Sequence, residues 1–319
     1  MRSPAAVSST RAVSSAGAVT AVVLAAVLFG TTGTAQELGP SGTTPLGVGA
    51  ARLAVGGLAL LLVLPLLGAS RSRAVALWRT PAGLTAGACT ALYQLAFFAA
   101  VDRAGVALGT LVTIGSGPVV AGLLAVVVRR ERAEPAWLAA TALCVAGLAL
   151  LSLTGGAGGA DVVGLLLALL SGVAYAVYTV VARHLMTAGA GRLAGAQPAE
   201  VMGSAFGLGG LLLLPVLAVQ PVGWLATPGG WALAAYLGLV TTTVAYVLFG
   251  RGLAVLPAGP VTTLVLAEPV VATVLGVTVL DERLSTAGAL GALLVLAGLA
   301  LQGVAAVRRR SPSPVPAAS

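Results

Sequence analysis

Residues 118–150 read PVVAGLLAVVVRRERAEPAWLAATALCVAGLAL, and residues 269–301 read PVVATVLGVTVLDERLSTAGALGALLVLAGLAL. The two stretches align without a gap at an offset of 151 residues, and 16 of their 33 positions are identical. Chance matching in a chain rich in alanine, leucine and valine would give about a third as many identities. The chain therefore contains an internal repeat, whose two copies are expected to fold alike.

The composition around this repeat is typical of a membrane protein. Hydrophobic residues make up 58% of the 319 positions, charged residues 8%, and the mean hydropathy is +1.05, whereas about a quarter of the residues in soluble proteins are charged. The apolar runs approach the roughly 20 residues that a helix needs to cross a bilayer, and they lack the alternation of barrel strands. We therefore predict an all-α, polytopic membrane protein with ten transmembrane helices, over residues 17–36, 44–69, 81–101, 104–128, 135–154, 162–185, 198–219, 230–250, 258–280 and 285–304.

The arginines indicate how these helices are oriented. With the amino terminus inside, the predicted cytoplasmic segments hold 14 of the 17 basic residues and the outer loops hold two, Arg103 and Arg283. Cytoplasmic loops carry such an excess of basic residues, so we expect both termini in the cytoplasm, in the plasma membrane of a bacterium. The net charge of +8 is then an orientation signal with some attraction to the lipid bilayer, and no nucleic-acid partner is expected.

The first helix has a second interpretation. Residues 11–35 resemble a secretory signal, with a basic start, an apolar stretch and small residues near TGTAQ. The repeat argues against cleavage, because removal of this helix would leave the first copy without a counterpart of the sixth helix.

Each copy of the repeat contains five predicted helices. Because five is an odd number, the second copy must enter the membrane from the opposite side. We predict a first five-helix repeat over residues 16–154 and a second, inverted one over residues 161–307, between disordered cytoplasmic termini at residues 1–15 and 308–319. Inverted repeats are the architecture of secondary transporters, whose sites lie near the midplane where the two halves meet.

Two stretches carry a resemblance to a known family. The stretch LAEPVVATVLGVTVLDERLSTAGALGALLVLAGLAL after the eighth helix and the stretch AYAVYTVVARHL in the sixth resemble the EamA-type transporters of the drug/metabolite transporter superfamily. The likeness covers about residues 18–307, nearly the whole chain. It implies an importer or exporter of amino acids, related metabolites, sugars or toxic compounds, in some members driven by a proton or sodium gradient.

A glutamate and a proline stand side by side in the ninth predicted helix. Glu268 is expected about 15 Å from either membrane surface, at 1.5 Å of rise per residue, where a carboxylate costs on the order of 2.5–3.5 kcal/mol. Pro269 lacks an N–H and should kink or open the helix beside this acid. Pro118 falls at the matching place in the other copy, within the sequence GSGP. Interrupted helices at corresponding positions indicate a transport site, although both prolines are also compatible with packing kinks.

Arg52 is the other charge well inside a predicted helix. Its side chain is long enough to reach the outer interface; if it points inward, it either binds a substrate carboxylate or neutralises Glu268. Polar and aromatic side chains at helical spacing are further candidates for a substrate cavity. These are Tyr93, Gln94, Thr113, Ser171, Tyr175, Tyr178, Thr242, Tyr246 and Phe249.

No metal or cofactor is expected, because Cys89, Cys144 and His184 stand apart in the sequence and no phosphate loop or metalloprotease motif occurs. An intramembrane enzyme acting on lipid-linked substrates is the alternative from another class, but it would need several acid/base groups at one depth. A channel would show rings of like residues, whereas Glu268 aligns with Gly117.

We therefore predict no enzymatic activity, and a secondary active transporter that moves small metabolites such as amino acids by alternating access. Export is favoured over import, with a proton or sodium gradient as the driving force. A multidrug or toxic-compound transporter and a sugar or nucleoside transporter of the same fold stay open as alternatives, as does a homodimer.

Overall fold

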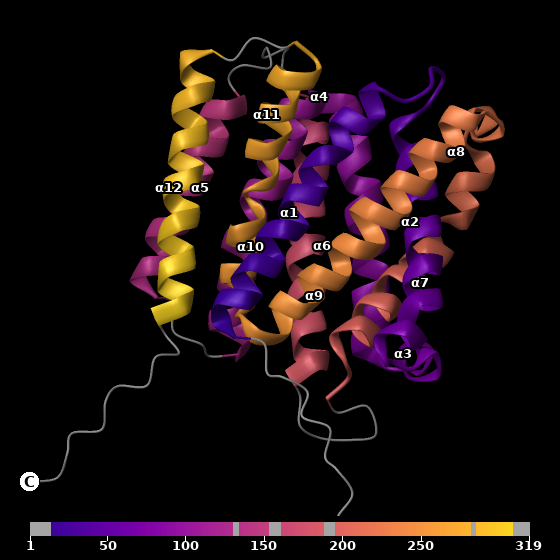
Figure 1. The fold of residues 1–319 in the computed structure, drawn as a ribbon, viewed down its shortest axis with the longest axis horizontal. Coiled ribbons are helices and arrows are strands. Elements are labelled where there is room, and N and C mark those ends of the chain that lie inside the picture. Colours follow the sequence, from indigo (N-terminus) through magenta and orange to yellow (C-terminus); the bar gives the residue numbers. More distant parts are fainter. Residues whose placement is uncertain (1–13, 130–133, 153–160, 188–194, 282–284, 309–319) are drawn as a thin grey trace, which may run out of the picture.

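The computed structural model describes residues 14–129, 134–152, 161–187, 195–281 and 285–308, and all its regular elements over these residues are helices. Figure 1 shows them as one bundle of roughly upright helices. In chain order the elements are α1 (Ser15–Glu37), α2 (Pro45–Val63), η1 (Leu64–Leu67), α3 (Arg71–Leu77), α4 (Pro81–Arg129), α5 (Pro135–Ser152), α6 (Val162–Thr187), α7 (Pro198–Val219), η3 (Gly223–Ala226), α8 (Pro228–Ala235), the π-helix η4 (Tyr236–Val244), α9 (Ala245–Val255), α10 (Ala258–Val265), α11 (Glu268–Val279) and α12 (Thr286–Arg308).

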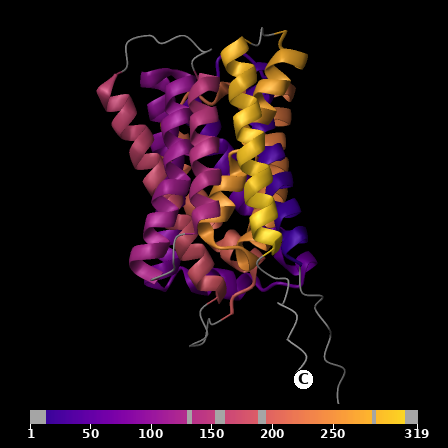
Figure 2. The same cartoon turned by 90° about the vertical axis from the view of Figure 1, so that its left-hand side faces the viewer.

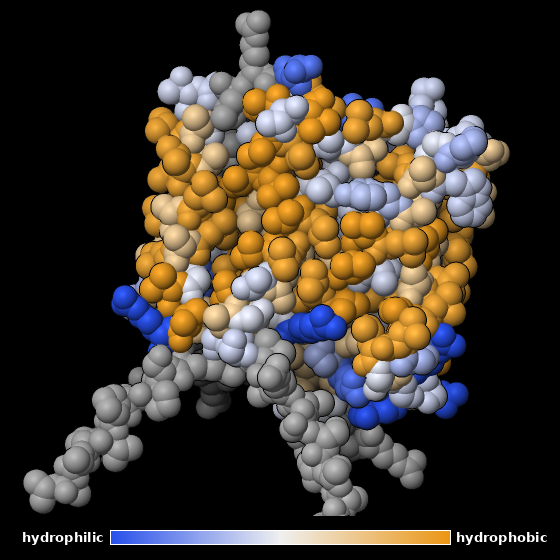
Figure 3. Space-filling view, in the orientation of Figure 1, coloured by the Kyte–Doolittle hydropathy of each residue, from blue (hydrophilic) through white to orange (hydrophobic). Residues whose placement is uncertain are grey.

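The described residues form a multi-pass membrane protein. Two shorter apolar helices, Gly109–Leu124 and Pro135–Leu150, accompany eight that are long and apolar enough to cross a membrane. Hydrophobic side chains form a broad belt around the middle of the bundle in Figure 3, with hydrophilic residues toward its two ends. The eight long helices are Ser15–Glu37, Pro45–Leu67, Pro81–Gly105, Val162–Thr187, Pro198–Val219, Pro228–Leu253, Ala258–Val279 and Thr286–Arg308.

The beginning of α1 and the end of α12 lie at the same end of the bundle (Figure 1), which we call the terminal end. The close approach of the two helices agrees with this placement. A Cβ atom added to Gly303, near the end of α12, would lie 3.8 Å from Val19 Cγ1, near the start of α1. At the opposite end, Arg103 Nη1 donates a hydrogen bond to Asp161 Oδ2 (2.9 Å). This bond holds the pKa of Asp161 below its ordinary value.

Two helix pairs pack so closely that only glycine fits between them. A Cβ atom on Gly57 of α2 would lie 2.2 Å from the Phe206 carbonyl oxygen of α7, and one on Gly210 of α7 would lie 2.7 Å from the Leu53 carbonyl oxygen of α2. Residue numbers rise along one helix as they fall along the other, so the two helices run antiparallel.

The pair α5 and α12 repeats this arrangement at the edge of the bundle (Figure 2). A Cβ atom on Gly147 would lie 2.5 Å from the Gly291 carbonyl oxygen, and one on Gly298 would lie 2.5 Å from Cys144 Sγ and 2.7 Å from the Ala140 carbonyl oxygen. These two helices are therefore antiparallel as well, and Cys144 is a buried packing residue that donates to the Val295 carbonyl (3.6 Å).

The expected helix break at Pro118 is corrected by the structure. The α4 helix continues through Pro118, and its non-helical residue is Gly105, with φ 80° and ψ 161°. Glycine adopts this positive φ without the clash that a Cβ atom would cause. Close packing explains why the chain stays helical at Pro118: a Cβ atom on Gly172 of α6 would lie 2.0 Å from Ser116 Oγ. A transmembrane helix tolerates the one hydrogen bond that proline removes when neighbouring helices support it.

Glu200 ties the start of α7 to the turn before α3 at the terminal end. Its side chain is 1% exposed. Oε1 accepts from the Ser70 N–H (3.0 Å), Oε2 accepts from the Gln197 N–H (3.0 Å), and Arg73 Nε lies 3.6 Å from Oε2. One carboxylate therefore satisfies two main-chain donors from separate parts of the chain.

We expect Glu200→Ala to destabilise the protein, because both main-chain donors would lose their acceptor, at about 1–3 kcal/mol for each buried group left unpaired. Glu37→Ala, a change of the same kind at an exposed position, is the control. Thermal unfolding of the purified variants in detergent measures the difference. Equal melting temperatures for the two variants would contradict this role.

Candidate functional site

The helix is interrupted at the centre of the ninth predicted span, between α10 and α11. Between α10 and α11 the Leu266 N–H donates to the Thr263 carbonyl (3.1 Å) and the Ala267 N–H donates to the Leu264 carbonyl (3.2 Å). Both bonds span three residues instead of four, so the chain tightens for one turn. Since Pro269 has no N–H to offer the Val265 carbonyl, the local sequence accounts for this break.

Glu268 begins α11 at this break. Its main chain rests against α1, where a Cβ atom on Gly30 would lie 2.7 Å from the Glu268 carbonyl oxygen. Its side chain is half-buried and forms no hydrogen bond with the described residues. The ion pairs of the described residues within 4.0 Å join Arg73 to Glu200 and Arg103 to Asp161. The Glu268 carboxylate thus has no direct charged partner in this part of the chain.

Arg52 turns inward. Its Nε donates to Thr242 Oγ1 (3.1 Å), and its Nη2 lies 3.5 Å from the Thr241 carbonyl oxygen. Arg52 therefore lies against the π-helix η4 and does not extend toward the interface, which resolves the two orientations that the sequence left open. The charges of Arg52 and Glu268 are near enough to act on each other without touching.

Aromatic residues surround these two charges. Tyr93 of α4 is half-buried, and its ring centroid lies 5.5 Å from that of Tyr175 in α6. Tyr93, Tyr175 and Tyr246 all lie within electrostatic range of Glu268. Among the expected site residues, the structure joins Arg52 to Thr242 and places Tyr93 against Tyr175.

Tyr175 contributes a buried hydroxyl that forms no hydrogen bond with the described residues. The neighbouring Thr179 hydroxyl donates to the Tyr175 main-chain carbonyl (2.8 Å). Tyr175 is 7% exposed, so its hydroxyl is a polar group held inside the bundle without a fixed partner.

Four other expected lining residues form contacts between helices. Tyr178 is 1% exposed and its hydroxyl lies 3.3 Å from Met202 Sδ, while Gln94 Nε2 bonds the Gly49 carbonyl (3.4 Å). Ser171 donates to the Tyr93 carbonyl (3.0 Å) and Thr113 donates to the Ala168 carbonyl (3.1 Å). Each of these side chains joins two helices.

A compact aromatic cluster, formed by Tyr178, Phe206, Tyr246 and Phe249, lies beside the two charges. The rings of Phe206 and Tyr246 have centroids 3.8 Å apart, and those of Tyr178 and Phe249 lie 6.4 Å apart. Tyr178 belongs to the last part of α6 and Phe206 to the first part of α7, and these parts face the terminal end in Figure 1. Phe206 was not among the residues expected from the sequence, because no charged residue lies close to Phe206 in α7 to indicate a functional site.

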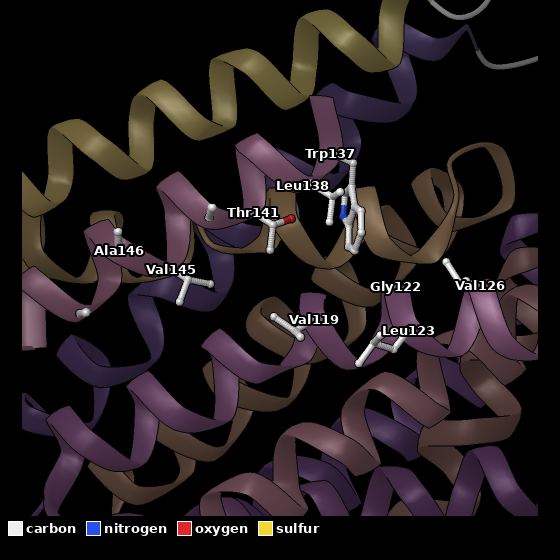
Figure 4. Close-up of a pocket in the computed structure, with 11 residues that line it drawn as sticks. Val119, Gly122, Leu123, Val126, Trp137, Leu138, Thr141, Val145 and Ala146 are labelled. Carbon is white, nitrogen blue, oxygen red and sulfur yellow. The ribbon is translucent and has the colours of Figure 1, made fainter. Parts of the chain in front are cut away.

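A separate cavity of about 620 Å³ lies between α4 and α5 (Figure 4). Apolar side chains line it, among them Val119 and Leu123 of α4 and Leu138 and Ala146 of α5, and Thr141 within it shares a hydrogen bond with Thr263 of α10 (2.9 Å). Neither Arg52 nor Glu268 belongs to its lining. It is an apolar groove apart from the charged site.

The described residues contain no cluster of three or more histidine, cysteine, aspartate or glutamate side chains that would hold a metal ion. The charged site presents two opposite charges, several hydroxyls and aromatic faces.

Comparisons with known proteins identify the family. The profile of the EamA-like transporter family matches residues 16–153 and again residues 162–303. The chain is 39% identical over 278 residues to the "Uncharacterized transporter YwfM" of Bacillus subtilis (strain 168), an alignment that covers 87% of this chain and 90% of that protein. A solved structure described as "Crystal structure of protein" superposes with a TM-score of 0.74 and 24% identity, over 92% of this chain and 99% of the other.

Proposed function

The chain belongs to the EamA-like transporter family and is a membrane transporter of the drug/metabolite type, and from this premise we propose that it carries a small zwitterion, such as an α-amino acid, between Arg52 and Glu268. The observation that carries the proposal is that two opposite charges inside the membrane bundle, Arg52 and Glu268, act on each other but form no ion pair. Arg52 would bind the carboxylate of the solute and Glu268 its ammonium group.

The energetics of buried charge support a zwitterion. A charge inside the hydrocarbon region costs on the order of 2.5–3.5 kcal/mol unless it is compensated. Arg52 has hydrogen-bond acceptors but no carboxylate partner among the described residues, and Glu268 has no cation. A solute that carries both charges compensates both residues at once, while the half-buried Tyr93 offers an aromatic face for its side chain. A sugar or nucleoside would leave both charges uncompensated.

We further propose that the bundle contains ten membrane spans arranged as two inverted five-helix repeats, residues 16–154 and 161–307. The contacts of Gly147 and Gly298 support this arrangement, because these residues are equivalent under the offset of 151 and each meets the other copy at equivalent places. Reciprocal contacts between antiparallel equivalents are those of a two-fold axis in the membrane plane. Gly57 and Gly210 in α2 and α7 make similarly reciprocal contacts, at an offset of 153 residues. Such halves can exchange conformations and open alternately to each side.

The terminal end is proposed to face the cytoplasm of a bacterium, in agreement with the arginine distribution. We propose export as the direction and a proton or sodium gradient as the driving force, with Glu268 as the group that exchanges the ion.

Substrate class is testable with a thermal-shift screen of the purified protein. We expect L-phenylalanine and other amino acids with apolar side chains to raise the melting temperature, because a ligand present at 100 times its Kd stabilises the folded state by about 2.7 kcal/mol. Sugars, nucleosides and cationic drugs should not. Flux of labelled L-phenylalanine into proteoliposomes then tests transport. A response to sugars or to cationic drugs alone would refute the zwitterion.

A further inference from the structure

The charged site rests against an unusual helix. Residues Tyr236–Val244 form the nine-residue π-helix η4 between α8 and α9. π-Helical turns are rare in proteins, and those that do occur often lie at functional sites. Two threonine hydroxyls support the wide turn by donating to carbonyls five residues back, Thr242 to Leu237 (2.8 Å) and Thr243 to Gly238 (3.0 Å).

The wide turn leaves an acceptor for Arg52. The Ala245 N–H bonds the carbonyls of Val240 and Thr242, whereas an α-helix would direct it to the Thr241 carbonyl. That Thr241 carbonyl oxygen is the one that lies 3.5 Å from Arg52 Nη2. Because the single hydroxyl proton of Thr242 is donated to Leu237, its lone pairs are available to accept from Arg52 Nε at 3.1 Å.

Helix packing places the guanidinium on this turn. Gly56 follows Arg52 by one helical turn in α2, and a Cβ atom there would lie 2.5 Å from Thr242 Cγ2 and 2.9 Å from the Gly238 carbonyl oxygen. Thr243 Oγ1 also lies 3.2 Å from the Gly56 carbonyl oxygen across the interface, so its single hydroxyl proton is shared between the Gly238 and Gly56 carbonyls. Thr241 and Thr242 are 0% exposed. The contact between α2 and η4 is thus closely packed on both sides of Arg52.

We propose that Thr242 is a positioning residue that holds the Arg52 guanidinium on η4 and prevents it from closing an ion pair with Glu268. This inference rests on the proposed function, in which both charges must stay open to the solute. Without the Thr242 hydroxyl, the guanidinium is released and pairs with the Glu268 carboxylate. The solute must then break that pair before it can bind.

Transport kinetics give the first test, with labelled L-phenylalanine in proteoliposomes. Thr242→Val should raise KM about tenfold or more, as expected for the loss of a hydrogen bond to a charged group, while kcat changes less than KM. Thr242→Ser keeps the hydroxyl and should restore the KM of the wild type. Thr90→Val is the matched control: it removes a similarly buried threonine hydroxyl that bonds only the Ala86 carbonyl of its own helix α4 (2.8 Å), and it should leave KM unchanged.

A second test needs no solute. Thr242→Val is made both in the wild type and in a Glu268→Gln background, and thermal unfolding of the four proteins is compared. The loss of melting temperature should be smaller, by at least about 2 °C, when Glu268 is present to capture the released Arg52. Equal losses in both backgrounds, or an unchanged KM, would overturn the assignment of Thr242. If Glu268→Gln and Arg52→Gln both transport like the wild type, the proposed function itself fails.

Discussion

Glu268→Gln is expected to slow gradient-driven transport about a hundredfold. Glutamine has the same shape as glutamate but can neither exchange a proton nor pair with an ammonium group. Placing an ionised group in the membrane interior costs on the order of 2.5–3.5 kcal/mol, so the loss of its compensating partner corresponds to about a hundredfold in rate. The measurement is solute flux in proteoliposomes, with and without an imposed pH gradient.

The fold should survive this substitution. The Glu268 side chain is half-buried and forms no hydrogen bond or ion pair with the described residues, so its charge contributes little to the folded state. Glu37→Gln, the same change at an exposed position at the end of α1, is the matched control and should transport normally. If the Glu268→Gln protein stayed folded and moved solute at the wild-type rate at every pH, Glu268 would have no coupling role.

Gly57→Ala is expected to disrupt the contact between α2 and α7. The added methyl group would lie 2.2 Å from the Phe206 carbonyl oxygen and 2.8 Å from its carbonyl carbon. Main-chain atoms cannot rotate aside as the end of a side chain can, so the two helices must move apart. Overpacking of this kind costs about 1–3 kcal/mol, or more where the backbone is fixed.

The consequence reaches the charged site. Phe206 lies against Tyr246, with 3.8 Å between ring centroids, so a displaced α7 also opens the aromatic cluster. Thermal unfolding in detergent and flux of the same preparation measure both effects. Gly33→Ala in α1 is the control, because no other atom lies within 4 Å of its added Cβ; alanine there should stabilise the helix by about 0.5–1 kcal/mol. Equal melting temperatures for the two variants would show that the α2–α7 contact tolerates expansion.

Several features of the molecule were available from the sequence because they depend on local chemistry. The length and hydropathy of each run mark a membrane helix whatever its neighbours are. The matching stretches at residues 118–150 and 269–301 reveal the repeat directly. Pro269 lacks an N–H in any environment, so an interruption beside Glu268 could be anticipated, and the structure shows one at Leu266 and Ala267.

The same rule failed at Pro118, where α4 stays helical. A missing N–H removes one hydrogen bond, but the neighbouring helix decides whether the chain bends. At Pro118 that neighbour is α6, packed against Ser116 through Gly172. Likewise, the sequence marked Tyr178 and Gln94 as candidates for a substrate cavity, and only the structure shows that Tyr178 contacts Met202 and that Gln94 bonds the Gly49 carbonyl.

The sequence by itself determined a membrane-embedded, duplicated helical chain with an acid and a proline at mid-span, because hydropathy, repetition and the missing N–H belong to the residues themselves. Only the tertiary structure decided where Arg52 points: its acceptors, Thr241 and Thr242, lie 189 and 190 residues away in sequence. A side chain that reaches either the interface or a neighbouring helix takes the direction that packing leaves open. Helix propensity and hydropathy do not encode which helix will be beside it.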